Sequence, residues 1–339
     1  MKYKIVFFDC TEQDKLKLTD YFKSKSNIDL LCIPTTINES EFVLIKNADV
    51  VAIHVSSLID KAILDKLPNL KLIACRSTGY DNVDLKAAKA KKILVCNIPS
   101  YGENTVAEFA FTLMLALSRR LFDITNAVTS GHIDPAKLTG IDLSGKTLGV
   151  IGTGRIGCHS IRIARGFAMN VIAYDLYPKA GLDSELGFRY VSLLELLRTS
   201  DFITLHAPAT KENDHLIDKH AFENMKRGTI LINTARGSLV DTEALINALD
   251  SGQLGGAGLD VIEGEDLLDV EHELHILKDH HVKDKIEEVA EIDILEKMPN
   301  VVVTAHNAFN SQEALARIRN TTIENIEKFI AESPQNLVS

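Results

Sequence analysis

Short apolar runs alternate along the chain with longer segments of helical or polar character, almost from end to end. In the N-terminal part these runs have the length and composition of β-strands separated by helices. They cover Lys4–Phe8, Ile28–Ile33, Val50–Val55, Leu70–Cys75 and Ile93–Asn97. This rhythm predicts a parallel sheet that carries helices on its faces.

A second series of strand-like runs follows a long helical segment. Its members are nearly all apolar, as is expected of strands that are buried on both faces of a sheet. They cover Thr147–Ile151, Asn170–Tyr174, Asp201–His206, Thr229–Asn233, Gly258–Val261 and Val301–Thr304. We therefore predict a second parallel sheet.

Two helical segments connect these series. The segment Glu103–Arg120 is apolar nearly all round, which predicts a buried helix that lies partly in a subunit interface. Asn310 followed by Glu313 resembles a capping box, and the helix that starts there runs toward Ile330 and returns the chain to the first domain.

The sequence thus predicts an α/β fold with a discontinuous first domain, residues 1–100 and 310–339, and an inserted second domain, residues 101–309. Two segments interrupt the rhythm. Thr129–Ser144 is a glycine-containing connector, and Glu263–Lys297, rich in acidic residues and histidine, has the composition of a surface insertion.

Composition narrows the function classes. The 339 residues, 45% hydrophobic and 25% charged, are typical of a globular two-domain protein. A net charge of −10 disfavours nucleic acid and anionic membranes as partners. No apolar run approaches the roughly 18 residues of a membrane-spanning helix, and Asp9 interrupts the short N-terminal apolar stretch that a signal peptide would need. Five cysteines without C-x-x-C spacing indicate the reducing cytoplasm.

A G-x-G-x-x-G pattern stands between a strand-like run and a helical one. Gly152 permits a tight bend, Gly154 lets the backbone approach a pyrophosphate, and Gly157 lets the helix pack closely on the strand. N–H groups at the helix start would bind the anion. Asp175 ends the next strand, where a carboxylate accepts ribose hydroxyls and repels a 2′-phosphate, so the pattern favours NAD over NADP. The alternative is a glycine turn that serves packing alone.

Hydride transfer from a nicotinamide to a ketone requires a group that polarises the ketone and an acid that protonates the developing alkoxide, and a substrate that carries a carboxylate also requires a cation. Arg236 follows one predicted strand and His306 ends another, where catalytic groups of open α/β sheets lie. Glu265 follows Asp260 by five residues and could raise the pKa of His306, although spacing leaves Glu263 as an equal candidate. The alternatives are a structural ion pair for the arginine, a hydrogen-bonded core histidine and solvated carboxylates.

Over essentially its whole length the chain resembles the D-isomer-specific 2-hydroxyacid dehydrogenases. The resemblance rests on eight motifs: R-S-T-G-Y-D-N-V-D (Arg76–Asp84), N-I-P-S-Y (Asn97–Tyr101), N-T-V-A-E (Asn104–Glu108), G-T-G-R-I-G (Gly152–Gly157), H-A-P (His206–Pro208), I-N-T-A-R-G (Ile232–Gly237), G-L-D-V (Gly258–Val261) and T-A-H (Thr304–His306). It implies two Rossmann-like domains, a flavodoxin-like substrate domain and an NAD-binding Rossmann domain, with the active site in the cleft between them. It also implies a cytoplasmic homodimer.

The resemblance assigns a role to individual residues. Arg236 would bind the substrate carboxylate and orient the ketone, while the His306–Glu265 pair would exchange the proton. Asp260 would face the nicotinamide carboxamide. Cofactor contacts are implied at Gly152, Gly154, Arg155, Ile156, Gly157, Asp175, His206, Ala207, Pro208, Asn213, Thr234, Ala235, Arg236 and Asp260, and substrate contacts at Ser77, Thr78, Gly79, Tyr101 and Arg236.

Within the family, Tyr101 and the E-G-E sequence before a long insertion are similar to D-lactate dehydrogenase-like members. The resemblance therefore implies an NAD-dependent oxidoreductase that interconverts a small 2-oxo acid and its D-2-hydroxy acid, with pyruvate and D-lactate favoured. Glyoxylate, hydroxypyruvate and branched-chain 2-oxo acids remain open as substrates, as does an NAD-sensing role like that of the related corepressors. Formate-specific relatives carry glutamine beside the histidine, so Glu265 argues against that chemistry.

Two features depart from the family pattern. Ala305 stands where relatives have proline, which loosens the backbone before His306. The insertion contains four histidines whose spacing matches no zinc pattern, so we predict no metal site; they are His272, His275, His280 and His281.

Overall fold

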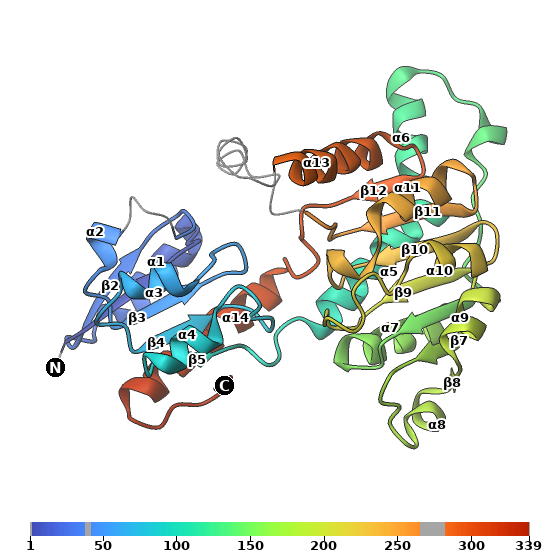
Figure 1. The fold of residues 1–339 in the computed structure, drawn as a ribbon. Helices are drawn as coiled ribbons and strands as arrows, with labels where there is room; N and C mark the ends of the chain where they lie inside the picture. The colour runs from blue at the N-terminus through green and yellow to red at the C-terminus, as the bar shows by residue number, and fades with distance from the viewer. Residues whose placement is uncertain (1, 38–41, 265–281, 339) are drawn as a thin grey trace. The chain divides into compact units, whose positions relative to one another are not determined.

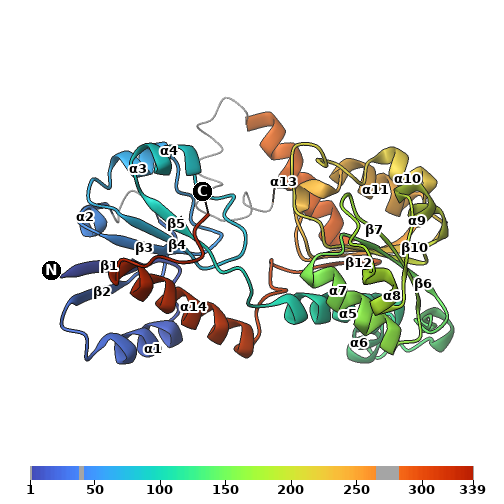
Figure 2. The same ribbon diagram turned by 90° about the horizontal axis from the view of Figure 1, so that it is seen from below.

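The computed structural model describes residues 2–37, 42–264 and 282–338. The chain forms two compact units, one of Met1–Tyr101 with Ser311–Ser339 and one of Gly102–Asn310, which we call unit 1 and unit 2. Each unit is a parallel sheet with helices on both faces (Figures 1 and 2), so the predicted α/β fold is confirmed.

Unit 1 contains a five-stranded parallel sheet in the order β2-β1-β3-β4-β5. This is the flavodoxin-like order of doubly wound folds. The strands are β1 (Tyr3–Phe7), β2 (Ile28–Cys32), β3 (Val50–Ile53), β4 (Leu72–Cys75) and β5 (Leu94–Cys96). The helices are α1 (Glu12–Phe22), α2 (Phe42–Ile45), α3 (Lys61–Asp65), α4 (Leu85–Ala90) and α14 (Gln312–Ile330).

Alternating side chains of the unit 1 strands supply two apolar cores. Val6 of β1 packs in a cluster with residues of α2, α3 and α4 on one face of the sheet. Its neighbours Ile5 and Phe7 pack on the other face with residues of α1 and α14. Because α14 comes from the C-terminal end of the chain, unit 1 is discontinuous in sequence.

Unit 2 contains a seven-stranded parallel sheet in the order β12-β11-β10-β9-β6-β7-β8. The first β-α-β crossover lies at its centre, as in Rossmann domains. The strands are β6 (Thr147–Ile151), β7 (Asn170–Tyr174), β8 (Arg189–Tyr190), β9 (Phe202–Leu205), β10 (Thr229–Asn233), β11 (Leu254–Leu259) and β12 (Val301–Val303). The α-helices are α5 (Glu103–Ser118), α6 (Leu121–Ser130), α7 (Arg155–Gly166), α8 (Leu182–Leu186), α9 (Leu193–Thr199), α10 (Lys219–Asn224), α11 (Thr242–Asp250) and α13 (Val282–Lys297), with 3₁₀ turns η2 (Pro135–Leu138) and η3 (Gly237–Leu239).

The two faces of the unit 2 sheet are covered by different helices. Residues of α5 and α7 form a core on one face. Residues of α9, α10, α11 and α13 form a core on the other. The expectation that Glu263–Lys297 is only a surface insertion is wrong for its last part, because Ile292 and Leu295 of α13 are buried in this core.

The helix α14 begins one residue later than the capping pattern predicted. Its N-cap is Ser311, whose hydroxyl accepts a hydrogen bond from the backbone N–H of Ala314 at 3.1 Å. Asn310 instead donates from its side-chain amide to Oδ1 of Asn307 at 2.8 Å. The asparagine therefore closes the preceding turn and does not cap the helix.

A buried arginine holds three elements of unit 1 together. The guanidinium of Arg76 donates to the carbonyls of Phe8 at 3.0 Å and Asp9 at 3.2 Å, and to the Asp14 carboxylate at 2.7 Å. Arg319 of α14 approaches the same carboxylate at 3.4 Å. Arg76 thereby connects the end of β4 to the end of β1 and to α1.

We predict that Arg76→Ala lowers the free energy of unfolding by about 3 kcal/mol, because it leaves two carbonyls without their buried donor and the Asp14 carboxylate with the longer contact to Arg319. Urea unfolding followed by circular dichroism measures the change. Lys61→Ala, which removes an exposed ion pair with Asp65, is the control and should leave the unfolding midpoint unchanged. Equal midpoints for Arg76→Ala and the wild type would contradict the role given to Arg76.

Candidate active site

The glycine loop joins the end of β6 to the start of α7. Gly152 has φ +95°, and a Cβ there would lie 2.6 Å from the His206 carbonyl oxygen. A Cβ on Gly157 would lie 2.0 Å from the Gly152 oxygen. A Cβ on Gly154 would meet nothing within 4 Å. The first and third glycines are thus required by packing, whereas the second borders open space beside the N-terminus of α7, which fits a pyrophosphate.

Asp175 follows β7 and turns back toward the glycine loop. One oxygen of its carboxylate accepts from the backbone N–H of Thr153 at 2.6 Å and from its hydroxyl at 2.7 Å. The other oxygen accepts from the Tyr177 N–H at 2.8 Å. Partial burial raises the pKa of Asp175, but these hydrogen bonds outweigh it and hold the pKa below its ordinary value. The ionised carboxylate suits the ribose of NAD, and Thr153, which the sequence did not single out, fixes its position.

The loop after β9 contains His206 and Asn213. Burial lowers the pKa of His206 to about 3, and its Nε2 lies 2.8 Å from the Ser160 hydroxyl, so the ring is neutral. Asn213 accepts from the Thr210 N–H at 2.6 Å and donates to the Pro208 carbonyl at 2.7 Å. Both side chains shape this loop, and the cofactor contacts predicted for residues 206–208 and 213 stay a prediction.

The turn after β10 presents Arg236. Asn233, the last residue of the strand, donates to the Arg236 carbonyl at 2.9 Å and accepts from the Ala235 N–H at 3.0 Å. Within this turn the Arg236 guanidinium is half-buried and donates to the Ala235 carbonyl at 2.7 Å. The hydroxyl of Thr234 is buried and has no hydrogen-bond partner among the described residues, which suits a residue predicted to contact cofactor.

The carboxylate of Asp260 fixes the turn that carries His306. It is 1% exposed and accepts from the Thr304 hydroxyl at 2.6 Å and from the N–H groups of Asn307 and Ala308 at 2.8 Å each. The backbone N–H of His306 donates to the Asp260 carbonyl at 2.9 Å, and His306 has φ +47°. The resemblance gave Asp260 only a cofactor contact, whereas the structure gives it the support of this left-handed residue.

Of the two glutamates that are candidates for the partner of His306, the structure describes Glu263 but not Glu265. Glu263 pairs with His215, whose Nε2 lies 2.9 Å from Oε1 and 3.1 Å from Oε2. Glu265 lies outside the described residues, so its pairing with His306 stays a prediction. The four histidines of the insertion also lie outside them, and residues 2–37, 42–264 and 282–338 hold no cluster of three potential metal ligands.

The predicted substrate residues of unit 1 follow β4. Ser77 donates to the Gly79 carbonyl at 2.6 Å, and Thr78 donates to the Ile98 carbonyl at 2.8 Å. Asn97 donates from its side chain to the Thr78 carbonyl at 2.8 Å. Tyr101, at the end of this unit, accepts through its carbonyl from the Arg317 guanidinium. The bonds of Ser77, Thr78 and Asn97 fix the conformation of the Ser77–Gly79 loop.

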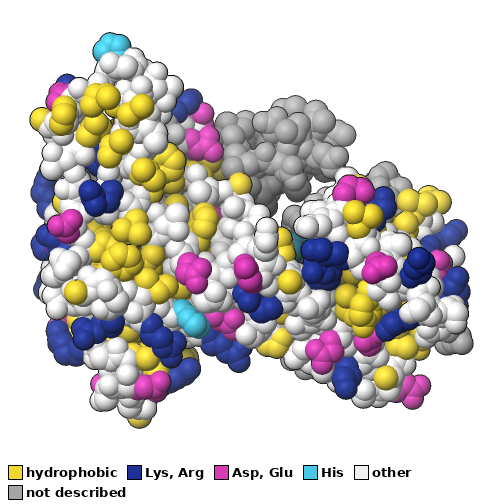
Figure 3. Space-filling model, turned by 180° about the vertical axis from the view of Figure 1, so that it is seen from behind, with side chains coloured by type: hydrophobic (Ala, Val, Ile, Leu, Met, Phe, Trp, Pro, Cys, Tyr) yellow, Lys and Arg dark blue, Asp and Glu magenta, His cyan; other side chains and the backbone are white. Residues whose placement is uncertain are grey.

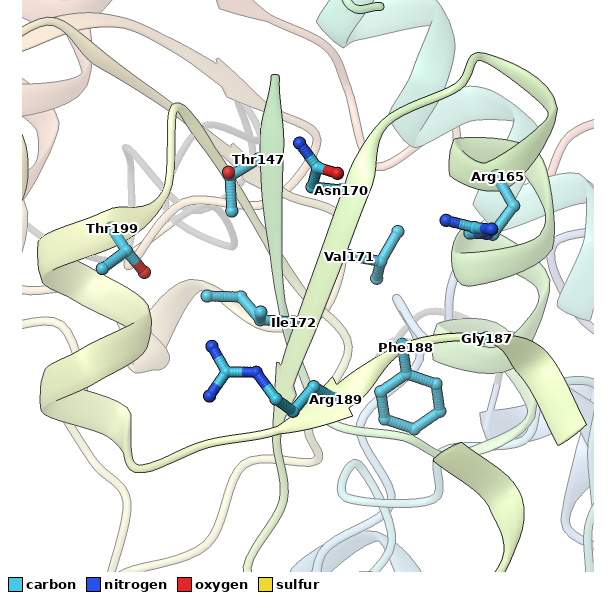
Figure 4. Close-up of a pocket in the computed structure, with 9 residues that line it drawn as sticks. All are labelled: Thr147, Arg165, Asn170, Val171, Ile172, Gly187, Phe188, Arg189 and Thr199. Carbon is cyan, nitrogen blue, oxygen red and sulfur yellow. The ribbon is translucent and has the colours of Figure 1, made fainter. Parts of the chain in front are cut away.

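A pocket of about 420 Å³ lies elsewhere on unit 2 (Figure 4). Its lining includes Thr147 and Asn170, the first residues of β6 and β7. Because these are the amino ends of the strands, the pocket lies at the sheet edge opposite the glycine loop. It therefore takes no part in the candidate active site.

The glycine loop follows β6, Asp175 follows β7, and polar groups follow the neighbouring strands β10, β11 and β12. This arrangement is typical of a dinucleotide-dependent oxidoreductase. Residues 111–308 match the family model described as D-isomer specific 2-hydroxyacid dehydrogenase, NAD binding domain. The chain belongs to the D-isomer-specific 2-hydroxyacid dehydrogenase family. Its members are NAD-dependent enzymes, and this chain carries their NAD-binding domain.

Relatives of different substrate classes resemble the chain to a similar degree. It is 39% identical to D-lactate dehydrogenase of Escherichia coli over 82% of each chain. It is 36% identical to glyoxylate reductase of Korarchaeum cryptofilum, over 87% of this chain and 84% of that one. The structure of D-lactate dehydrogenase from Aquifex aeolicus, complexed with NAD and lactic acid, superposes with a TM-score of 0.86 at 35% identity and covers 98% of both chains. Within the described residues no helix has the length and hydropathy needed to cross a membrane.

Gly154→Ala tests the glycine loop. We predict that this variant folds as stably as the wild type, because the new Cβ meets open space at an ordinary φ of −66°. We also predict that it binds NADH at least tenfold more weakly, since the methyl group takes room needed by the pyrophosphate. Gly166→Ala is the matched control, because its Cβ also meets nothing within 4 Å but lies at the far end of the same helix. Fluorescence titration with NADH measures binding. Equal affinities in the two variants would contradict the placement of the cofactor.

Proposed function

We propose that this chain is a D-lactate dehydrogenase that reduces pyruvate with NADH and acts through Arg236 and His306. The supporting observation is that the two residues follow β10 and β12, which lie on either side of β11 in one parallel sheet. Asn233 of β10 pairs with Leu259 of β11, and Leu259 pairs with Val303 of β12. Arg236 and His306 each come three residues after the end of their strand, so both belong to the carboxyl edge of one sheet.

In this proposal the guanidinium of Arg236 binds the substrate carboxylate through its planar fork and orients the ketone. The imidazolium of His306 donates its proton to the carbonyl oxygen, and in the reverse direction the neutral ring accepts the hydroxyl proton. Asp260 holds His306 in place for both directions. The bound NADH supplies the hydride for the carbonyl carbon. Glu265 is the predicted carboxylate partner that favours the protonated ring.

Arg236→Gln and His306→Ala test these roles. We predict that each variant loses at least about 100-fold in kcat/KM for pyruvate, because it removes the carboxylate cation or the general acid, while the Kd for NADH stays within about threefold of the wild type. NADH absorbance measures turnover and NADH fluorescence measures binding. Turnover close to that of the wild type in both variants would overturn the assignment.

The choice of pyruvate is the finer part of the proposal. Differences of a few side chains, each worth roughly 1–3 kcal/mol, separate small 2-oxo acids, and the resemblance to D-lactate dehydrogenases supports pyruvate. A panel of pyruvate, glyoxylate, hydroxypyruvate and branched-chain 2-oxo acids, assayed with NADH and NADPH, decides it. We expect the highest kcat/KM with pyruvate and NADH, and in reverse the oxidation of D-lactate but not L-lactate. A higher kcat/KM with glyoxylate than with pyruvate would contradict this choice and would identify glyoxylate as the preferred substrate.

A homodimer is also part of the proposal, and we propose that α6 belongs to its contact surface, while the role predicted for the helix before it stays a prediction. The predicted interface helix, α5, packs against α7 and β11 within unit 2. The helix α6 that follows has no buried residue, and its Phe122 and Val128 are 53% and 62% exposed. Ile133 of the connector is also exposed, and Figure 3 shows hydrophobic side chains gathered on a face of this unit. Apolar surface of this kind favours a second copy of the chain as partner.

We predict that the wild type has the mass of a dimer of 37.4 kDa chains in size-exclusion chromatography with light scattering, and that Phe122→Asp with Val128→Asp shifts it toward the monomer, because two charges cannot be buried in an apolar contact. Leu16→Asp, at an exposed leucine of α1, is the control and should stay dimeric. A double variant that remains a dimer would exclude α6 as the interface.

A further inference from the structure

His215 and Glu263 form a histidine–carboxylate pair that the proposed reaction does not use. The two are far apart in sequence, yet the histidine Nε2 lies within hydrogen-bond distance of both carboxylate oxygens, at 2.9 and 3.1 Å. The side chains are 40% and 32% exposed, so water reaches the pair but does not surround it. His215 lies between β9 and α10, and Glu263 lies after β11.

The backbone of His215 is fixed against the turn that follows Arg236. His215 has φ +50°, in the left-handed region, and its N–H donates to the Ser238 carbonyl at 2.8 Å. Two residues later the N–H of Ile217 donates to the Leu239 carbonyl at 2.9 Å. The segment from residue 215 to 217 therefore runs beside η3, which begins immediately after Arg236.

Glu263 reaches the same turn through its backbone. A Cβ on Gly237 would lie 2.3 Å from the carbonyl carbon and oxygen of Ile262 and 2.5 Å from the N atom of Glu263. The peptide between residues 262 and 263 thus packs directly against Gly237, the residue that follows Arg236. Glu263 contacts this turn with its backbone and binds His215 with its side chain, so the Arg236 turn is enclosed between the two segments.

The charges around His215 favour its protonated form. The hydrogen bond that His215 donates to the Glu263 carboxylate raises the pKa of His215 above its ordinary value. Partial desolvation opposes this rise, and the charges of Glu263, Asp241 and Asp214 add to it. A histidine whose pKa is raised by folding contributes its stabilisation fully at pH below its unfolded pKa and loses it as the pH rises through the folded pKa. The charged pair is therefore complete in mildly acidic solution and weakens in alkaline solution.

We propose that the His215–Glu263 pair positions Arg236 for the substrate carboxylate by clamping the Arg236–Gly237 turn between residues 215–217 and 262–263. The inference rests on the proposed function of Arg236. His215 is a positioning residue and not a catalytic one, because its side chain acts through Glu263 and the turn. Loss of the pair loosens the turn and weakens carboxylate binding, whereas the glycine loop and Asp175 still hold NADH.

His215→Ala gives the first test, with oxamate, a carboxylate-bearing isostere of pyruvate, as the probe. We expect the Kd for oxamate in the enzyme–NADH complex, measured by calorimetry, and the KM for pyruvate to rise about fivefold or more, with kcat changed less and the Kd for NADH unchanged. The matched control is His220→Ala, which removes an exposed histidine 3.8 Å from Glu223 on the surface of α10 and should change none of these values.

His215→Gln gives the second test, because glutamine keeps an N–H donor but does not titrate. We expect this variant to bind oxamate nearly as well as the wild type at low pH. We also expect it to lose the part of the pH dependence that the wild type shows as His215 deprotonates. The NMR titration of His215 in the wild type and in Glu263→Gln measures the pair itself, and its pKa should fall in the variant.

The outcomes separate the inference from the proposed function. If no 2-oxo acid supports NADH oxidation by the wild type, the proposed function fails, and oxamate binding still tests the clamp. If the NMR titration shows the pair but His215→Ala binds oxamate as tightly as His220→Ala, the positioning role is overturned. Failure of the wild type to bind oxamate at all also overturns it, since Arg236 then receives no carboxylate.

Discussion

One buried carboxylate organises the candidate active site. Asp260 is desolvated at the end of β11, and three donors from residues 304–308 satisfy it. A buried charge is stable only with such partners, so the hydrogen bonds that stabilise Asp260 also fix the turn after β12. His306 lies in that turn in a left-handed conformation that few non-glycine residues adopt. The Ala305 before it therefore does not need the rigidity of proline for the turn to be defined.

The rest of the site follows from parallel strands that end at one edge. Asn233 at the end of β10 shapes the Arg236 turn, and the N–H of Asp260 donates to the Asn233 carbonyl at 2.9 Å. The last residues of three neighbouring strands are thus bonded to one another before any substrate binds. Preorganisation of this kind is what electrostatic catalysis requires, because the donors need not reorient as charge develops. On the other side of β9 the same edge carries the glycine loop and Asp175.

Both sheets were predictable because their strands are continuous apolar runs. The glycine loop was predictable because packing requires Gly152 and Gly157, and Gly154 leaves open space at the start of α7. β11 was predicted to begin at Gly258 but begins at Leu254, since Gly255 and Gly256 interrupt the apolar run. A Cβ on Gly255 would lie 2.4 Å from the Gly228 oxygen, so close packing and not side-chain burial determines that stretch. The two-residue strand β8 is too short to give a pattern. The His215–Glu263 pair joins residues whose proximity depends on the tertiary fold, and spacing alone left Glu263 and Glu265 equivalent.

The central claim is that Arg236 and His306 act on one substrate from the same sheet edge. A crystal structure of the complex with NADH and oxamate measures this most directly. The account predicts the Arg236 guanidinium on the oxamate carboxylate and a ring nitrogen of His306 about 2.6–3.2 Å from the adjacent carbonyl oxygen. An oxamate bound with either side chain turned away from it would contradict the claim.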